Sequence, residues 1–197
     1  MEQKKKSGPA IFMDCVILLA IALALACFAA YYSGWFPSGT VLWTGITAFT
    51  ITYHFKMRLI LGEITQRCHI RYDQRWFREH PFERRIYRLL QVKHWKDKAL
   101  TYNPELFSVK DRTLEQIANA MAKAETDHWL NELVSLSTIF FALIWGEAWI
   151  FVLTAIIAMA FDAQFILIQR YNRPRVVKLL KKKQQRQDHV AVTWSEK

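Results

Sequence analysis

Two short stretches of this sequence hold side chains whose types and spacing suit chemistry. In the first, AETDHW, Glu125 and His128 are three positions apart, so on a helix they lie side by side. A carboxylate beside an imidazole fixes its tautomer and stabilises its protonated form, as a general base acting on an alcohol requires. The spacing predicts a catalytic pair, but it also suits an ordinary histidine at a membrane interface. A metal site is not predicted, because helical di-metal proteins need two such motifs.

The second stretch, QRYNRPR, is rich in arginine. Guanidinium groups present planar forks that bind phosphate or carboxylate through two hydrogen bonds, and an asparagine side chain both donates and accepts. The alternative role is anchoring at a membrane surface, which the lysines that follow already supply. On the first interpretation, the predicted substrate-binding residues are Arg170, Tyr171, Asn172, Arg173 and Arg175.

Two further features have polar groups in apolar surroundings. In KHWKDK, Trp95 could hold a ring or an acyl chain while Lys96 and Lys98 bind phosphate, although a helix lying at the interface has the same composition. Asp162 lies deep in an apolar segment, where a carboxylate is costly unless it pairs with a polar neighbour or binds substrate.

The composition indicates the class of protein that must position these residues. The chain has 197 residues and a formal net charge of +10, and 52% of its residues are hydrophobic. The hydrophobic residues are gathered into long blocks, whereas a soluble nucleic-acid-binding protein would disperse them through short amphipathic elements. We therefore expect an integral membrane protein and no nucleic-acid partner. Its three cysteines have no metal-ligand spacing and are interpreted as structural.

The hydrophobic blocks predict an all-α fold with about four hydrophobic helices in two hairpins. SGWFPSG joins two expected spans, 11–32 and 39–60. Residues 133–168 would form a helix of roughly 54 Å against a hydrocarbon core of roughly 30 Å, so they must turn, most simply at Gly146–Glu147. This second hairpin either crosses the membrane or is re-entrant. The predicted regions are 1–61 (first hairpin), 62–129 (interfacial amphipathic helices), 130–170 (second hairpin) and 171–197 (basic tail).

The distribution of Lys and Arg predicts the topology. Cations occupy the N-terminus, the 56–129 region and the C-terminal tail, whereas the two predicted turns at the opposite side contain none. Positive charge favours the cytoplasmic side, so both termini are expected in the cytoplasm. The second hairpin must then return its chain to the face that it left, which predicts that AETDHW and QRYNRPR are neighbours.

Three motifs in order, WKDK, ExxHW and QRYNRPR with a following lysine-rich run, give the chain a family resemblance. Over roughly residues 84–187 it resembles the glycosyl-4,4'-diaponeurosporenoate acyltransferase family. These are bacterial membrane enzymes of staphyloxanthin-type carotenoid synthesis that esterify a sugar hydroxyl with a fatty acyl group.

The resemblance implies a chemical role for each predicted site. The partners would be membrane lipids, a lipid-linked sugar acceptor and an acyl donor such as acyl-CoA, with no other cofactor, in a bacterial cell membrane. His128 would take the proton from the acceptor hydroxyl, Glu125 would orient it, and Asn172 or an arginine would stabilise the oxyanion. Transfer would be direct, because no serine or cysteine nucleophile is suitably placed.

Two alternatives stay open. A non-catalytic membrane protein that binds anionic lipid or a partner enzyme needs the same basic face, and so does a different lipid-modifying enzyme, for example one that acts on a polyprenyl-linked substrate. The sequence leaves the oligomeric state open.

Overall fold

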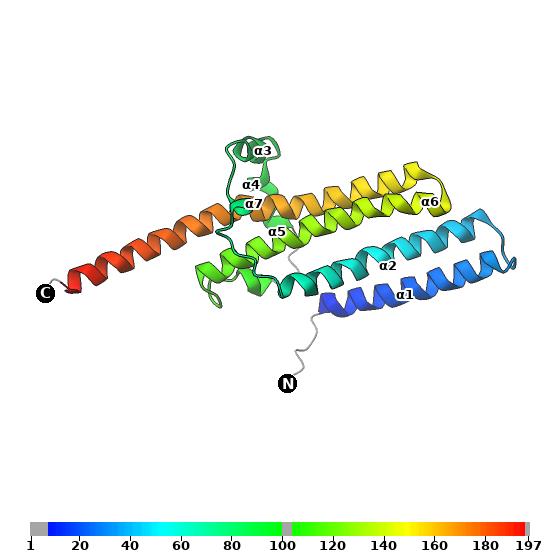
Figure 1. Cartoon of the computed structure of the whole chain (residues 1–197), viewed down its shortest axis with the longest axis horizontal. Helices are drawn as coiled ribbons and strands as arrows, with labels where there is room; N and C mark the ends of the chain where they lie inside the picture. Colours follow the sequence, from blue (N-terminus) through cyan, green and yellow to red (C-terminus); the bar gives the residue numbers. More distant parts are fainter. Residues whose placement is uncertain (1–7, 100–103, 196–197) are drawn as a thin grey trace, which may run out of the picture. The chain divides into compact units, whose positions relative to one another are not determined.

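The structure is a computed structural model that describes residues 8–99 and 104–195. Every regular element within these residues is a helix (Figure 1). The α-helices are α1 (Gly8–Tyr32), α2 (Gly39–Gln66), α3 (Glu83–Leu89), α4 (Val92–Trp95), α5 (Leu114–Ser137), α6 (Ala142–Trp145) and α7 (Ala148–Ser195). Short 3-10 helices are η1 (Arg75–Phe77), η2 (Lys96–Lys98), η3 (Pro104–Phe107) and η4 (Thr138–Phe141).

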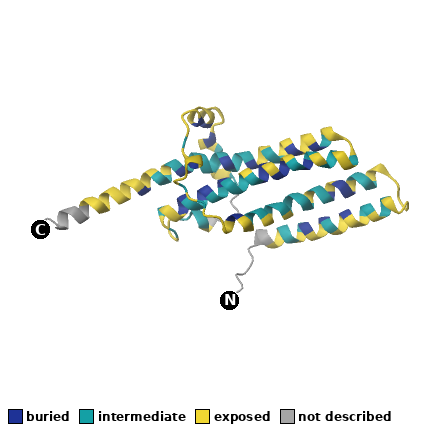
Figure 2. Cartoon of the chain, viewed as in Figure 1, coloured by how far each residue is buried: buried dark blue, intermediate teal, exposed yellow. Residues whose placement is uncertain are grey.

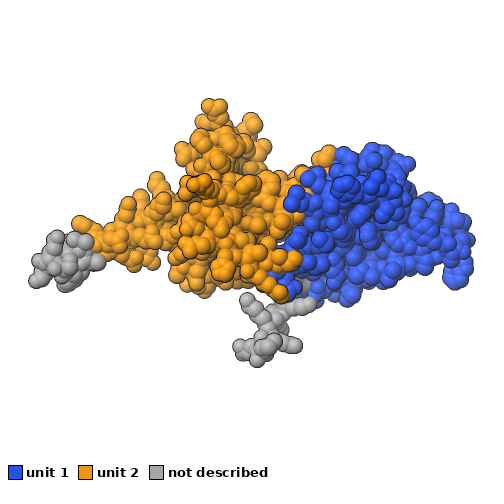
Figure 3. All heavy atoms as spheres, in the orientation of Figure 1, with its two compact units in different colours: residues 1–63, 133–155 blue, residues 64–132, 156–197 orange. Residues whose placement is uncertain are grey.

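The chain divides into two compact units (Figure 3). Unit 1 comprises Met1–Glu63 and Leu133–Ala155, and unit 2 comprises Ile64–Glu132 and Ile156–Lys197. Both long helices of the second half, α5 and α7, contribute residues to each unit.

In unit 1, α1 and α2 approach closely because small residues lie between them. A Cβ atom at Gly45 of α2 would lie 3.0 Å from the Cβ atom of Cys27 and 3.1 Å from the Phe28 ring, both on α1. Ala20 and Ala24 of α1 are also buried. Small side chains at such positions allow two helix backbones to come together, as in membrane helix pairs.

Aromatic side chains fill the rest of unit 1. The Phe28 and Trp145 rings stack with their centroids 5.8 Å apart, and Phe49 lies 5.3 Å from Phe141. The turn that leads into α7 follows at Gly146 and Glu147, whose φ angles are 75° and 49°. The break in the helix expected at these two residues is thus present.

In unit 2, α5 and α7 run antiparallel: a residue later in α5 contacts a residue earlier in α7. Glu125 meets Arg173, whereas His128 meets Asp162. The start of α5 is fixed by reciprocal hydrogen bonds: the Thr113 amide donates to Oε1 of Gln116, and the Gln116 amide donates to Oγ1 of Thr113. This arrangement is a capping box, which satisfies amide groups that have no partner within the helix.

Two helices are long and apolar enough to cross a membrane, Ile11–Tyr32 and Ala148–His189. Large apolar side chains on α1 are exposed in the isolated protein, among them Phe12, Leu18 and Leu19. Figure 2 shows that exposed positions recur along this helix. The prediction of four hydrophobic helices in two hairpins goes further than this finding and stays a prediction.

Two expected boundaries do not coincide with helix ends. The division at 129/130 falls inside α5, and α7 continues through 171 to Ser195 although Pro174 lies within it. The expected basic tail is therefore, up to Ser195, a continuation of the helix that carries Asp162.

Candidate active site

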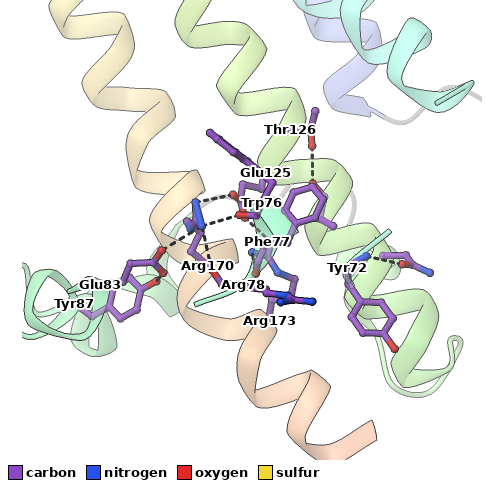
Figure 4. Close-up of polar contacts among 12 residues, drawn as sticks. Tyr72, Trp76, Phe77, Arg78, Glu83, Tyr87, Glu125, Thr126, Arg170 and Arg173 are labelled. Atoms are coloured by element: carbon purple, nitrogen blue, oxygen red, sulfur yellow. Dashed lines mark hydrogen bonds and ion pairs between the residues drawn. The ribbon is translucent and has the colours of Figure 1, made fainter. Parts of the chain in front are cut away.

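The buried carboxylate of Glu125 binds two arginines of α7 (Figure 4). Nη1 of Arg173 donates to Oε2 of Glu125 at 2.5 Å. Nη1 of Arg170 lies 3.2 Å from Oε1, which makes an ion pair without hydrogen-bond geometry. Glu125 is 0% exposed, and a carboxylate so far from water requires cationic partners of this kind.

The same two arginines also hold the segment that precedes α3. Nη2 of Arg173 donates to the carbonyl oxygen of Phe77 at 2.9 Å, and its guanidinium lies 4.8 Å from the centre of the Phe77 ring. Nη2 of Arg170 donates to the Trp76 carbonyl at 3.0 Å and pairs with Glu83 at 3.2 Å. Arg170 and Arg173 thus tie α5, η1 and α3 to α7, and the terminal nitrogens of both guanidinium groups are engaged within the protein.

His128 has a different carboxylate as its partner. Its Nδ1 donates to Oδ1 of Asp162 at 2.8 Å, and Nδ2 of Asn131 donates to the same oxygen at 3.3 Å. The imidazole stacks on Phe165, with ring centroids 4.7 Å apart and planes inclined by 8°. A proton held on Nδ1 leaves Nε2 as the basic nitrogen. The His128 side chain is 23% exposed, whereas Asp162 is fully buried.

This geometry separates the two residues that sequence spacing joined. Glu125 and His128 are neighbours on α5, but the recorded contacts join Glu125 to arginines and join His128 to Asp162. Asn172 lies ten positions beyond Asp162 on α7, about 15 Å along the helix axis, so the structure does not bring it to the His128–Asp162 pair.

The predicted residues of the WKDK motif lie at the end of α4 and in η2. Nε1 of Trp95 donates to the Leu90 carbonyl at 2.8 Å, across Gln91, whose φ is 50°. Nζ of Lys96 lies 2.5 Å from Oδ1 of Asp97, and Lys98 is exposed. These contacts engage Trp95 and Lys96 with residues close to them in the sequence.

A cavity of about 700 Å³ is bounded by α3, α4 and α7 within unit 2. Among the described residues that line it, the one carboxylate is that of Glu79, which Arg84 binds through two hydrogen bonds of 3.1 Å. The other cations in the lining are Arg88, Lys93, Arg175 and Lys178. A second cavity, of about 760 Å³, shares Lys178 with the first and is also lined by Arg173, Lys181 and Lys182.

Two tyrosines form part of the wall of the first cavity. The rings of Tyr87 and Tyr171 meet edge to face, with centroids 5.4 Å apart, and the Arg175 guanidinium lies 3.6 Å from the centre of the Tyr171 ring. Burial, and then the hydrogen bond from its hydroxyl to Glu83, raise the pKa of the Tyr87 phenol well above its ordinary value. Tyr87 is therefore a neutral, fixed wall of the cavity.

Of the predicted substrate-binding residues, Tyr171 and Arg175 line this cavity, and their role in binding stays a prediction. The cavity is also lined by Arg88, Lys93 and Lys178, which the sequence did not single out. The signal for Arg88 was present, since Arg84 and Arg88 are four residues apart and share a helical face. Among the residues that the structure describes, no group of three His, Cys, Asp or Glu side chains is arranged to hold a metal ion.

Comparison with known families identifies one match. The sequence pattern of the family described as glycosyl-4,4'-diaponeurosporenoate acyltransferase matches residues 73–182, which include α3, α4, α5 and the site residues of α7. Neither a curated protein nor a solved structure matches the chain.

Proposed function

This chain belongs to the glycosyl-4,4'-diaponeurosporenoate acyltransferase family, and we propose that it transfers a fatty acyl group from acyl-CoA or a similar donor to a sugar hydroxyl of a membrane glycolipid. The family description names an acyltransferase that acts on a glycosyl carotenoid, so a carotenoid glycoside is the first acceptor to test. The observation that supports this function best is the His128–Asp162 pair.

His128 acts as the general base in this proposal. Its Nε2 takes the proton from the acceptor hydroxyl as the hydroxyl oxygen attacks the thioester carbonyl carbon. The C–S bond then breaks, and the departing thiolate takes the proton from the imidazolium. Asp162 holds the ring and stabilises its positive charge, and Asn131 helps to fix Asp162.

Glu125 has a positioning role in this proposal. Its bonds to Arg170 and Arg173 join α5 to α7 and so fix the register that brings His128 to Asp162. The rate therefore depends on Glu125 through the folded arrangement, and not through a contact between Glu125 and the imidazole.

We place the reaction at a bacterial cell membrane. The length and composition of α1 and α7 support this location, as do the exposed apolar side chains of α1. The absence of Lys and Arg from 33–38 and 146–147 supports a topology of two hairpins with both termini in the cytoplasm.

The test is an assay of the purified protein in lipid nanodiscs with a fatty acyl-CoA and a glycosyl carotenoid. Mass spectrometry should detect the acceptor with one added acyl group, and a thiol reagent should detect released CoA in equal amount. His128→Gln should lower the rate by roughly two to four orders of magnitude, the usual share of proton transfer in catalysis. Full activity in this variant would exclude His128 as the base.

The alternative of a non-catalytic lipid-binding protein makes the opposite prediction. It requires no ester product with the wild-type protein. Lipid extracts of cells with and without the protein should then contain the same amount of each glycolipid and of its acylated form.

A further inference from the structure

We propose that the 700 Å³ cavity between α3, α4 and α7 binds the phosphate-bearing nucleotide portion of a CoA thioester, with Arg88, Lys93, Arg175 and Lys178 as its cationic contacts. This inference rests on the proposed function, because it names where the acyl donor of that reaction would bind. The volume of the cavity falls within the range of small-molecule sites, roughly 300–1,000 Å³.

The charge of the cavity lining favours a polyanion. Glu79 and Arg84 neutralise each other through paired hydrogen bonds. Within the described part of the chain, no carboxylate is recorded as an ion-pair partner of Arg88, Lys93 or Lys178. Like charges held together on a cavity wall repel one another until an anion binds between them.

A nucleotide matches this charge better than a phospholipid headgroup does. CoA carries a phosphomonoester, which has about −1.5 to −2 charge at neutral pH, and also an anionic pyrophosphate. A headgroup with one phosphodiester would leave most of the cations without a partner. The aromatic wall formed by Tyr87 and Tyr171 also offers a ring surface for a base, and bases stack on aromatic side chains.

Position along α7 connects the cavity to the proposed base. Tyr171, which lines the cavity, lies nine residues beyond Asp162, about 14 Å along the helix axis. The pantetheine arm of CoA has a backbone as long as about four extended residues, roughly 14 Å. A nucleotide in the cavity could thus place its thioester near His128, which Asp162 binds.

The contacts of the three arginines in QRYNRPR indicate two different roles. Arg170 and Arg173 are engaged with Glu125 and with backbone carbonyls, so they are structural. Arg175, whose guanidinium stacks on Tyr171, lines the cavity. The donor site therefore uses only one arginine of QRYNRPR and draws its other cations from α3, α4 and the next turn of α7.

The experiment measures binding of CoA itself, without an acyl group, to the protein in nanodiscs of a zwitterionic lipid by isothermal titration calorimetry. Arg88→Gln and Lys93→Gln should each raise the dissociation constant about tenfold, as expected for loss of a charge-assisted hydrogen bond. The matched control is Lys181→Gln, which removes the same charge from the second cavity only and should leave CoA affinity unchanged. The unfolding temperature of each variant verifies its fold.

The outcomes separate this inference from the proposed function. Weakened CoA binding in the two variants, with no ester formed by the wild type, would support the binding site and contradict the acyltransferase reaction. Ester formation with unchanged CoA affinity in both variants would overturn the site alone, as would equal weakening by Lys181→Gln.

A lipid arm tests the other source of phosphate. The protein is extracted from membranes that contain phosphatidylglycerol, and the co-purified lipid is quantified by mass spectrometry. If the wild type retains phosphatidylglycerol, binds no CoA, and loses the lipid in Arg88→Gln, the cavity holds a headgroup and the nucleotide proposal is wrong.

Discussion

Glu125 and His128 lie on the same face of one helix, yet each has its own set of partners on α7. Glu125 forms ion pairs with two guanidinium groups. His128 is hydrogen-bonded to Asp162 through one ring nitrogen and is partly exposed. The two residues therefore respond differently to the same kind of substitution, and the two predictions that follow use this difference.

Glu125→Gln should act mainly on stability. It leaves Arg173 buried without a counter-charge and Arg170 with Glu83 as its remaining carboxylate, and breaking a buried ion pair in this way costs about 3–5 kcal/mol. The free energy of unfolding, measured with denaturant in detergent micelles, should fall by that amount. Unchanged stability together with a loss of rate as large as that of His128→Gln would contradict the structural role and restore Glu125 to the catalytic centre.

Asp162→Asn should act on the chemical step. An amide cannot stabilise an imidazolium and permits the wrong tautomer of His128, so we expect kcat to fall by roughly two to four orders of magnitude with little change in KM for the acceptor. Steady-state kinetics over a range of pH values should show that the pH dependence of kcat differs from that of the wild type. A change in KM alone would contradict a role for Asp162 in orienting the base.

The sequence predicted the chemical groups of this site better than it predicted their partners. The spacing of Glu125 and His128 is local, and the helix rule that places them side by side is correct. The partner of His128 is 34 positions away and that of Glu125 is 48 positions away, so both depend on the register between α5 and α7. No local pattern specifies that register, because it depends on contacts between two helices that are far apart in the sequence.

At the scale of elements, the break in the second hydrophobic region could be predicted from a glycine. The break before α7 occurs at Gly146, where a positive φ favours a residue without a Cβ atom. The extent of α7 was not predictable in the same way. A basic tail was expected over 171–197, but neither Pro174 nor the lysines that follow it prevent a long helix from continuing.

The close approach of α1 and α2 predicts opposite effects at two glycines of α2. Gly45→Leu should destabilise unit 1 by about 1–3 kcal/mol, because the new side chain meets Cys27 and Phe28 at once. Gly62→Leu should be neutral or stabilising, because its Cβ atom would meet open space and leucine favours helix. Thermal unfolding in micelles checks both variants, and equal effects would contradict the close packing at Gly45.

At the scale of the whole molecule, charge and apolar surface predict a topology. Introduced into a cysteine-free variant, Ser38→Cys should react with a membrane-impermeant maleimide added outside intact cells, because 33–38 lacks Lys and Arg. Lys110→Cys should react only after the cells are opened, because it belongs to the cation-rich region. The reverse labelling pattern would overturn the proposed cytoplasmic location of both termini.

One unbroken helix, α7, carries both Asp162 and the wall of the cavity from Tyr171 to Lys178. In such a helix the number of residues between two side chains fixes both their axial separation and the angle between their directions. Each residue adds about 1.5 Å and one step of a 3.6-residue turn. Inserting or deleting one residue between Asp162 and Tyr171 would turn the cavity wall away from the base by more than a quarter of a circle. Relatives that retain this chemistry should therefore accept substitutions in this interval while keeping its length constant.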